Sequence, residues 1–125
     1  MRRAIGFLGA MICWAAAIVP APAMADARAG AVVFASKCAA CHSNHHGVTL
    51  VGPSLAGVFG RKAGALKDFP YSPAVKASPI VWGADTLDAF IAQPRRIIPG
   101  ITMTAPGVAD ATQRADLIAY LATLR

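Results

Sequence analysis

Apolar residues recur at spacings of three and four in three parts of the chain, and no pair of stretches shows the alternation typical of β-strands. This pattern predicts helices at about residues 27–40, 86–92 and 110–124. A short extra turn is expected at residues 74–77. We therefore predict an all-α fold of three main helices plus short turns and long loops.

Polar residues and a proline mark the ends of these helices. Asp26 is expected to cap the first helix, and Asp85 precedes the second. Pro94 ends the second, because proline cannot continue the helical hydrogen-bond ladder. Asp110, with Gln113 three residues later, has the capping-box pattern at the start of the third.

Glycine and proline are frequent across residues 47–83, where little regular structure is predicted. A loop of this length normally argues against a compact domain. It fits one only if the loop packs on a large bound group.

Residues 1–25 have the pattern of a secretory signal peptide. Two arginines begin it, residues 4–19 are almost wholly apolar, and an A-x-A cleavage site ends at Ala25. Cleavage before Asp26 leaves residues 26–125 as one mature domain. The expected location is the periplasm.

Two alternatives to a cleaved leader are weaker. An uncleaved anchor needs about 20 apolar residues, more than this run offers. A lipoprotein signal would have a small residue where Ile12 precedes Cys13. Losing the two leader arginines lowers the net charge from +6 to +4, and Cys38 and Cys41 become the only cysteines, in a compartment where an ordinary pair forms a disulfide.

The segment Cys38-Ala39-Ala40-Cys41-His42 is compatible with a redox dithiol, a zinc site or covalent haem attachment. On a helix, residues three apart share a face, so both sulfurs would reach one porphyrin edge. His42 would then ligate the iron. Haem attachment explains the adjacent histidine, and a disulfide does not.

Zinc is the main competing interpretation, because His45 and His46 stand nearby. Structural zinc usually uses two separated pairs of ligands, and no Cys or His follows His46. A thioredoxin-like dithiol lacks its βαβ context. We expect His45 and His46 to be exposed loop residues.

Met103 is the only methionine after the leader. It is either a core-filling residue or a thioether ligand completing His/Met coordination of iron, which favours the ferrous state. With both axial positions occupied, no place remains for a substrate or oxygen. This favours electron transfer rather than catalysis, so the protein is not expected to be an enzyme.

Taken together, these motifs resemble class I cytochrome c, the small soluble carrier of mitochondria and bacteria, over nearly all of residues 30–124. The resemblance implies three main helices, with the first and last crossing, and loops that wrap one covalently bound haem. It rests on Gly30, Phe34, the CAACH segment, Val51–Lys62, Phe69–Tyr71, Trp82, Pro94–Arg96, Ile98–Met103 and Asp116–Leu121.

The resemblance also implies roles for residues around the haem. Pro53 would offer its carbonyl to the ring N–H of His42. Tyr71 and Trp82 would donate hydrogen bonds to a buried haem propionate, and Arg61 would offset its charge.

Three positions depart from close relatives of that family. Phe90 replaces a tyrosine near the methionine sulfur, Val75 replaces an asparagine by the inner propionate, and Ile101 replaces a threonine. Each change removes a hydrogen-bonding group from beside the haem. We predict a drier haem pocket with fewer internal waters.

The family exchanges single electrons with acidic redox partners through a ring of lysines. Here Lys37, Lys62, Arg95 and Arg96 supply part of such a face, while Thr102 stands where relatives often have lysine. The predicted export and the absence of a run of basic and aromatic residues argue against nucleic acid as a partner. The expected protein is a monomeric periplasmic electron carrier; the alternatives are a haem subunit held by a dehydrogenase, and a ligand-binding or peroxidatic haem protein.

Overall fold

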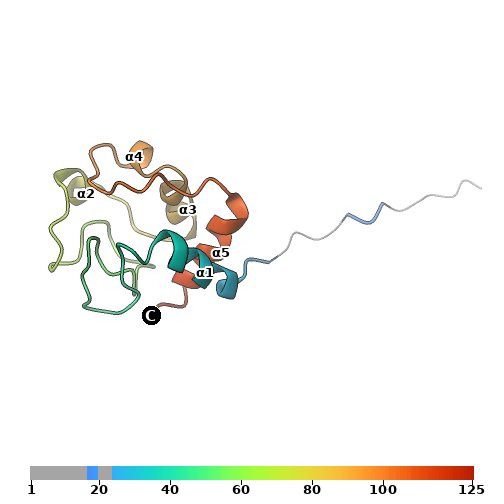
Figure 1. The fold of residues 1–125 in the computed structure, drawn as a ribbon. Coiled ribbons are helices and arrows are strands. Elements are labelled where there is room, and N and C mark those ends of the chain that lie inside the picture. The colour runs from blue at the N-terminus through green and yellow to red at the C-terminus, as the bar shows by residue number, and fades with distance from the viewer. Residues whose placement is uncertain (1–16, 20–23) are drawn as a thin grey trace, which may run out of the picture.

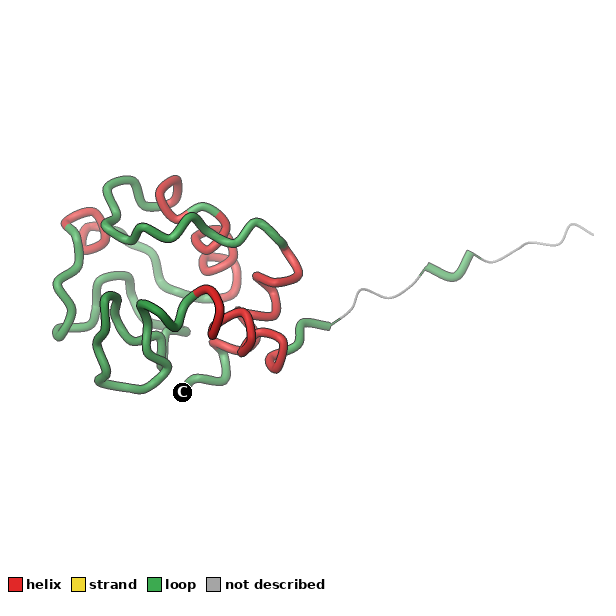
Figure 2. Tube along the Cα trace, viewed as in Figure 1, coloured by secondary structure: helices red, strands yellow, loops and turns green. Residues whose placement is uncertain are grey.

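Five helices follow one another in the part of the chain that the computed structural model describes, residues 17–19 and 24–125 (Figure 1). They are α1 (Ala27–Lys37), α2 (Pro73–Ala77), α3 (Ala84–Ala92), α4 (Pro94–Ile97) and α5 (Ala111–Leu121). Loops make up most of the rest, and no strand occurs among these residues (Figure 2). The predicted all-α fold is confirmed.

The first helix ends three residues earlier than predicted. The N–H groups of Cys38 and Ala39 both donate to the Phe34 carbonyl, at 2.8 and 2.9 Å, so the chain leaves regular α-helical geometry at this point. The Cys38 carbonyl then accepts from the N–H groups of Cys41 (3.0 Å) and His42 (2.9 Å). The two cysteines therefore lie within one hydrogen-bonded turn that follows α1, and the prediction that the helix itself continues to residue 40 was wrong.

Two of the predicted caps are confirmed. The carboxylates of Asp26 and Asp110 each accept a backbone N–H from the first turn of α1 and α5 at 2.8 Å. Asp85 is not the cap of the second helix. Gly83 occupies that position, and its N–H donates to the hydroxyl of Thr86 at 2.8 Å, leaving Asp85 in the first turn.

The short helices differ in how far local sequence predicted them. The extra turn expected at residues 74–77 is α2, whose first turn is capped by the Ser72 hydroxyl, 3.3 Å from the N–H of Val75. The four-residue helix α4 was not predicted. Pro94 both follows α3 and begins α4, since its fixed φ suits a first helical turn.

The two terminal helices cross at Gly30, as the resemblance implied. A side chain at Gly30 would collide with the Asp116 carbonyl and with Tyr120, so α1 and α5 approach each other backbone to backbone. Beside the crossing, the rings of Phe34 and Tyr120 lie 5.4 Å apart, and Leu117 is only 1% exposed. The crossing therefore forms the centre of the core.

The buried apolar residues form two clusters. The first lies around the helix crossing and consists of Val33, Phe34, Val58, Leu87, Leu117 and Leu121. The second is smaller and consists of Ala63, Val75 and Ile98. Trp82 packs against both clusters, and it thereby joins the long loop of residues 47–83 to the helices.

The predicted signal peptide falls largely on residues 1–16 and 20–23, which lie outside the described residues. Within residues 17–19 and 24–125, no helix is both long enough and apolar enough to cross a membrane.

Candidate haem site

Both cysteines of the CAACH segment are free. Cys38 is half-buried beside the first apolar cluster, and Cys41 is exposed. Burial, helped by the proximity of Cys41, raises the pKa of the Cys38 thiol to about 11. Before a group is attached to its sulfur, Cys38 is therefore a neutral thiol at physiological pH.

One ring nitrogen of His42 is held by a hydrogen bond to the backbone. Its Nδ1 lies 2.8 Å from the carbonyl oxygen of Pro53, and a carbonyl can only accept, so Nδ1 carries the proton. Nε2 is then the unprotonated nitrogen, the form that ligates metals. Burial lowers the pKa of His42, while the bond to Pro53 opposes that shift. The lowered pKa keeps the ring neutral.

A glycine makes this ring position possible. Gly52 is buried against the imidazole of His42, and a Cβ at Gly52 would collide with the ring. The N–H of Gly52 also donates to the Cys41 carbonyl at 2.7 Å, and Leu55 donates to the Ser43 carbonyl at 2.9 Å. These backbone bonds join the two sides of the loop, and so they fix Pro53 opposite the ring.

Arg61 and Trp82 are brought together by backbone pairing. The N–H of Trp82 donates to the Arg61 carbonyl at 2.9 Å, and Gly60 donates to the Trp82 carbonyl at 2.7 Å. The guanidinium of Arg61 donates to the carbonyls of Ser54 (2.6 Å) and Ala56 (3.2 Å). Burial lowers the pKa of Arg61. Its other N–H groups remain for an anion.

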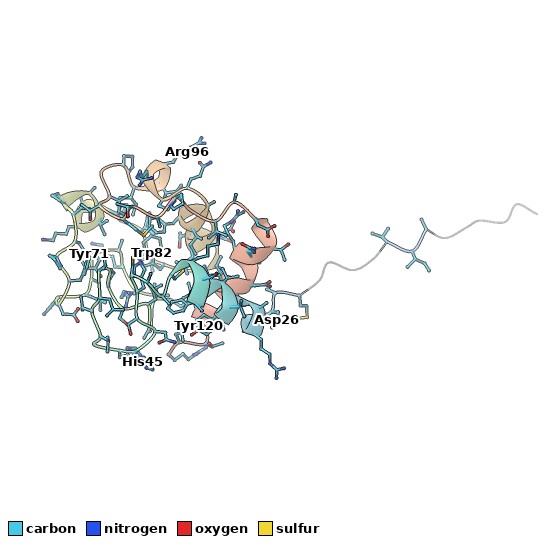
Figure 3. All side chains as sticks on the ribbon, viewed as in Figure 1. Asp26, His45, Tyr71, Trp82, Arg96 and Tyr120 are labelled. Atoms are coloured by element: carbon cyan, nitrogen blue, oxygen red, sulfur yellow. The ribbon has the colours of Figure 1, made fainter. Side chains whose placement is uncertain are left out.

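Tyr71 packs against the second apolar cluster together with Trp82, and the two lie near each other in Figure 3. The Tyr71 ring meets Phe69 edge to face at 4.9 Å. Burial raises the pKa of the Tyr71 hydroxyl, which keeps it protonated and able to donate. The structure thus groups the three residues expected near a propionate, although Arg61 already holds two carbonyls.

Met103 is partly buried on the long segment between α4 and α5. In Figure 1 this segment runs along the top of the molecule, whereas the loop that follows α1 lies at the bottom. The two segments that carry the candidate axial ligands, His42 and Met103, therefore lie on opposite sides of the molecule in this view.

The three apolar replacements share one environment. Val75 is buried in the second cluster, and Phe90 and Ile101 pack against it. The Phe90 ring lies 4.9 Å from that of Trp82. The three positions that depart from the family pattern, Val75, Phe90 and Ile101, thus lie together in one apolar surface.

A haem fits this set of residues. His42 presents Nε2, two free thiols precede it, and several large apolar side chains are only partly buried by the protein itself. These are Leu55, Trp82, Phe90, Ile91, Ile101 and Met103.

The remaining sequence-predicted residues lie at the surface. His45 and His46 are exposed, as expected, and Figure 3 places His45 and Arg96 at opposite edges of the molecule. Lys37 ends α1, directly before Cys38. Among the described residues, no group of three or more His, Cys or Asp is arranged to hold a metal ion.

Sequence reasoning missed several contacts that shape the site. The amide of Asn44, two residues after His42, donates to the Tyr120 hydroxyl at 2.9 Å. Arg95 donates to the Thr104 carbonyl, also at 2.9 Å. Neither pair produces a local signal, because its members are distant in sequence or separated by irregular loop.

Comparisons with known proteins agree with this geometry. The family model for cytochrome c matches residues 27–125. Cytochrome c of Euglena viridis is 39% identical over 100 residues, covering 80% of this chain and 98% of that protein. Cytochrome c2 of Rhodopila globiformis is 45% identical over 96 residues, covering 77% and 91%. Among solved structures, cytochrome cH from Methylobacterium extorquens matches with a TM-score of 0.73 and 40% identity, covering 78% of this chain and 98% of that one.

Proposed function

The chain belongs to the cytochrome c family, and we propose that it is a periplasmic electron carrier with His42 and Met103 as axial ligands. Members of this family are electron carriers rather than enzymes. The chain carries one c-type haem, bound covalently through Cys38 and Cys41. When bound, the haem supplies one-electron chemistry between ferric and ferrous iron. The protein residues set its position, ligation and surroundings.

The observation that carries this proposal is the placement of the His42 ring. Its Nδ1–H is committed to Pro53 O at 2.8 Å, so Nε2 is left as the ligand atom. Gly52 closes one side of the imidazole, which limits rotation of the ring. The proximal ligand is thus held in one tautomer and one orientation.

On the other side, Met103 is the only methionine after the predicted cleavage site. A thioether ligand favours ferrous iron and raises the potential. With His42 and Met103 both bound, no coordination position remains for substrate or oxygen, which suits a carrier.

The polar residues near the site receive roles within the same proposal. Tyr71 and Trp82 donate to one haem propionate, and Arg61 offsets its charge. Holding a carboxylate by neutral donors and a fixed cation keeps the charge in place when the iron changes oxidation state. Pro53 acts through the histidine ring.

For localisation, we infer that residues 1–25 are a signal peptide removed after export, leaving the domain 26–125. The support is the charged start, the apolar run and the A-x-A site at Ala25. The mature protein is inferred to be a periplasmic monomer.

Electron exchange is proposed to occur beside Cys41, the exposed cysteine of the attachment segment. Lys37 stands just before the segment, and three exposed apolar side chains, Val48, Leu50 and Val51, follow it. Val51 is 77% exposed. An acidic redox protein with an apolar centre to its docking face would complement this surface.

Visible spectroscopy of the haem-loaded protein tests the ligation. We expect a far-red sulfur-to-iron band in the oxidised form and little response of the reduced form to carbon monoxide. A Met103→Ala variant should lose the band and bind carbon monoxide quickly. Rapid binding and no far-red band in the unaltered protein would refute His/Met ligation and favour a ligand-binding haem protein.

A further inference from the structure

The segment that carries Met103 is attached to the rest of the protein at both ends. At its start, the N–H of Ile101 donates to the Ile98 carbonyl at 3.2 Å. At its end, Val108 donates to the Ile91 carbonyl at 2.8 Å, and Gly107 packs against the end of α3 with a φ of 96°. The intervening residues, 102–107, have no regular structure.

Within the described part of the chain, a single hydrogen bond reaches residues 102–107. It comes from Arg95, whose Nη2 lies 2.9 Å from the carbonyl oxygen of Thr104. Thr104 directly follows Met103. This one bond therefore fixes the backbone next to the proposed sulfur ligand.

Arg95 itself is well placed to act as an anchor. It is the second residue of α4, which begins at the buried Pro94, and the N–H of Ile98 closes that helix on the Pro94 carbonyl at 3.0 Å. The next residue, Arg96, has the same charge but donates to Gln93 on its own turn instead, at 3.3 Å. Two adjacent arginines thus differ in whether they reach the methionine loop.

We propose that Arg95 is a positioning residue for Met103: its bond to the Thr104 carbonyl restrains the loop and keeps the thioether on the iron. This inference rests on the proposed His/Met ligation. A charge-assisted hydrogen bond is stronger than a neutral one, and here it is the loop's one tie between its two anchored ends. Losing this bond should make the conformation in which Met103 has left the iron more frequent, without unfolding the helices.

The test compares Arg95→Gln with Arg96→Gln in the full haem-loaded protein. The two variants lose the same charge from neighbouring positions on one helix. The first readout is the rate at which carbon monoxide binds the ferrous form, since binding requires the methionine to leave. The second is the temperature at which the far-red band disappears, compared with the temperature at which helical circular dichroism is lost.

We expect Arg95→Gln to bind carbon monoxide about fivefold faster, a modest effect because this charge-assisted hydrogen bond is exposed to solvent. Its far-red band should disappear at a lower temperature while the helices melt as before. Arg96→Gln should match the unaltered protein. Arg95→Lys keeps a donor but lacks the planar guanidinium, so its rate of carbon monoxide binding should lie between that of Arg95→Gln and that of the unaltered protein.

Equal behaviour of the two glutamine variants would overturn the inference, because it would assign any change to charge alone. The inference would also be overturned if, in Arg95→Gln, the temperature of band loss and the temperature of helix melting fell by the same amount. That result would indicate a general structural role. In both cases the carrier function would stand, provided the unaltered protein shows the far-red band. An unaltered protein without that band would overturn the ligation and this inference together.

Discussion

The α-carbon of Gly30 lies directly against the backbone carbonyl of Asp116, so α1 and α5 are in contact where no side chain separates them. Leu117 and Phe34 are buried next to this point. The 73 residues between these two helices, 38–110, include both candidate axial ligands. The helix crossing therefore controls the stability of the whole fold.

Gly30→Ala should lower the free energy of unfolding of the haem-loaded protein by about 2 kcal/mol, because the added methyl group must push the helices apart. Urea unfolding followed by circular dichroism measures this. Gly83→Ala is the matched control, since a Cβ there meets nothing within 4 Å, and it should lose less than about 1 kcal/mol. Equal losses would show that the crossing is not the cause.

The apolar surface formed by Val75, Phe90 and Ile101 should exclude water from that side of the haem. A high-resolution structure of the loaded protein is expected to show no ordered water between these three side chains; one such water would contradict the prediction. Val75→Ala should lower stability by about 1–3 kcal/mol, because it removes buried methyl groups from an apolar cluster. Val81→Ala, at a valine that is 54% exposed, should change stability little.

Stability should fall at high pH in part through Tyr71. Burial raises the pKa of its hydroxyl above the ordinary value of 10.0. A group whose folded-state pKa is raised contributes stability below its unfolded pKa and loses it as pH rises through the folded pKa. We expect the unfolding free energy to decline above pH 10, and Tyr71→Phe to decline less over the same range.

Urea titrations of the unaltered protein and of Tyr71→Phe, from pH 8 upward, measure that difference. Other groups that titrate in this range are present in both proteins, and so they cancel in the comparison. Identical curves would mean that the tyrosine does not sense the folded environment.

Lys37, directly before the attachment segment, should steer anionic partners toward that surface. The ferrous protein should reduce ferricyanide more slowly as salt rises, whereas reduction of a cationic cobalt(III) complex should become faster. Lys37→Gln should slow the reaction with ferricyanide by about twofold at low salt. Lys76→Gln, which removes the same charge from α2, should have a smaller effect; rates independent of salt would refute steering.

Much of the local architecture was predictable because its causes are local. Asp26 and Asp110 cap their helices through hydrogen bonds to N–H groups two and three residues away, and such contacts leave a sequence pattern. The candidate attachment segment, Cys38 to His42, is equally readable, since its chemistry lies in five consecutive residues. The helix boundary at Lys37 was missed because Ala39 and Ala40 are good helix formers.

The sequence by itself determined the three main helices, the short helix α2, the covalent attachment segment and the single methionine of residues 26–125. Only the tertiary structure decided that Gly52 lies against the His42 ring, and that Arg95 holds the carbonyl of Thr104. These contacts join segments whose spacing follows no helical or strand period. They arise when irregular loops pack on one another, so no local rule of propensity or periodicity encodes them.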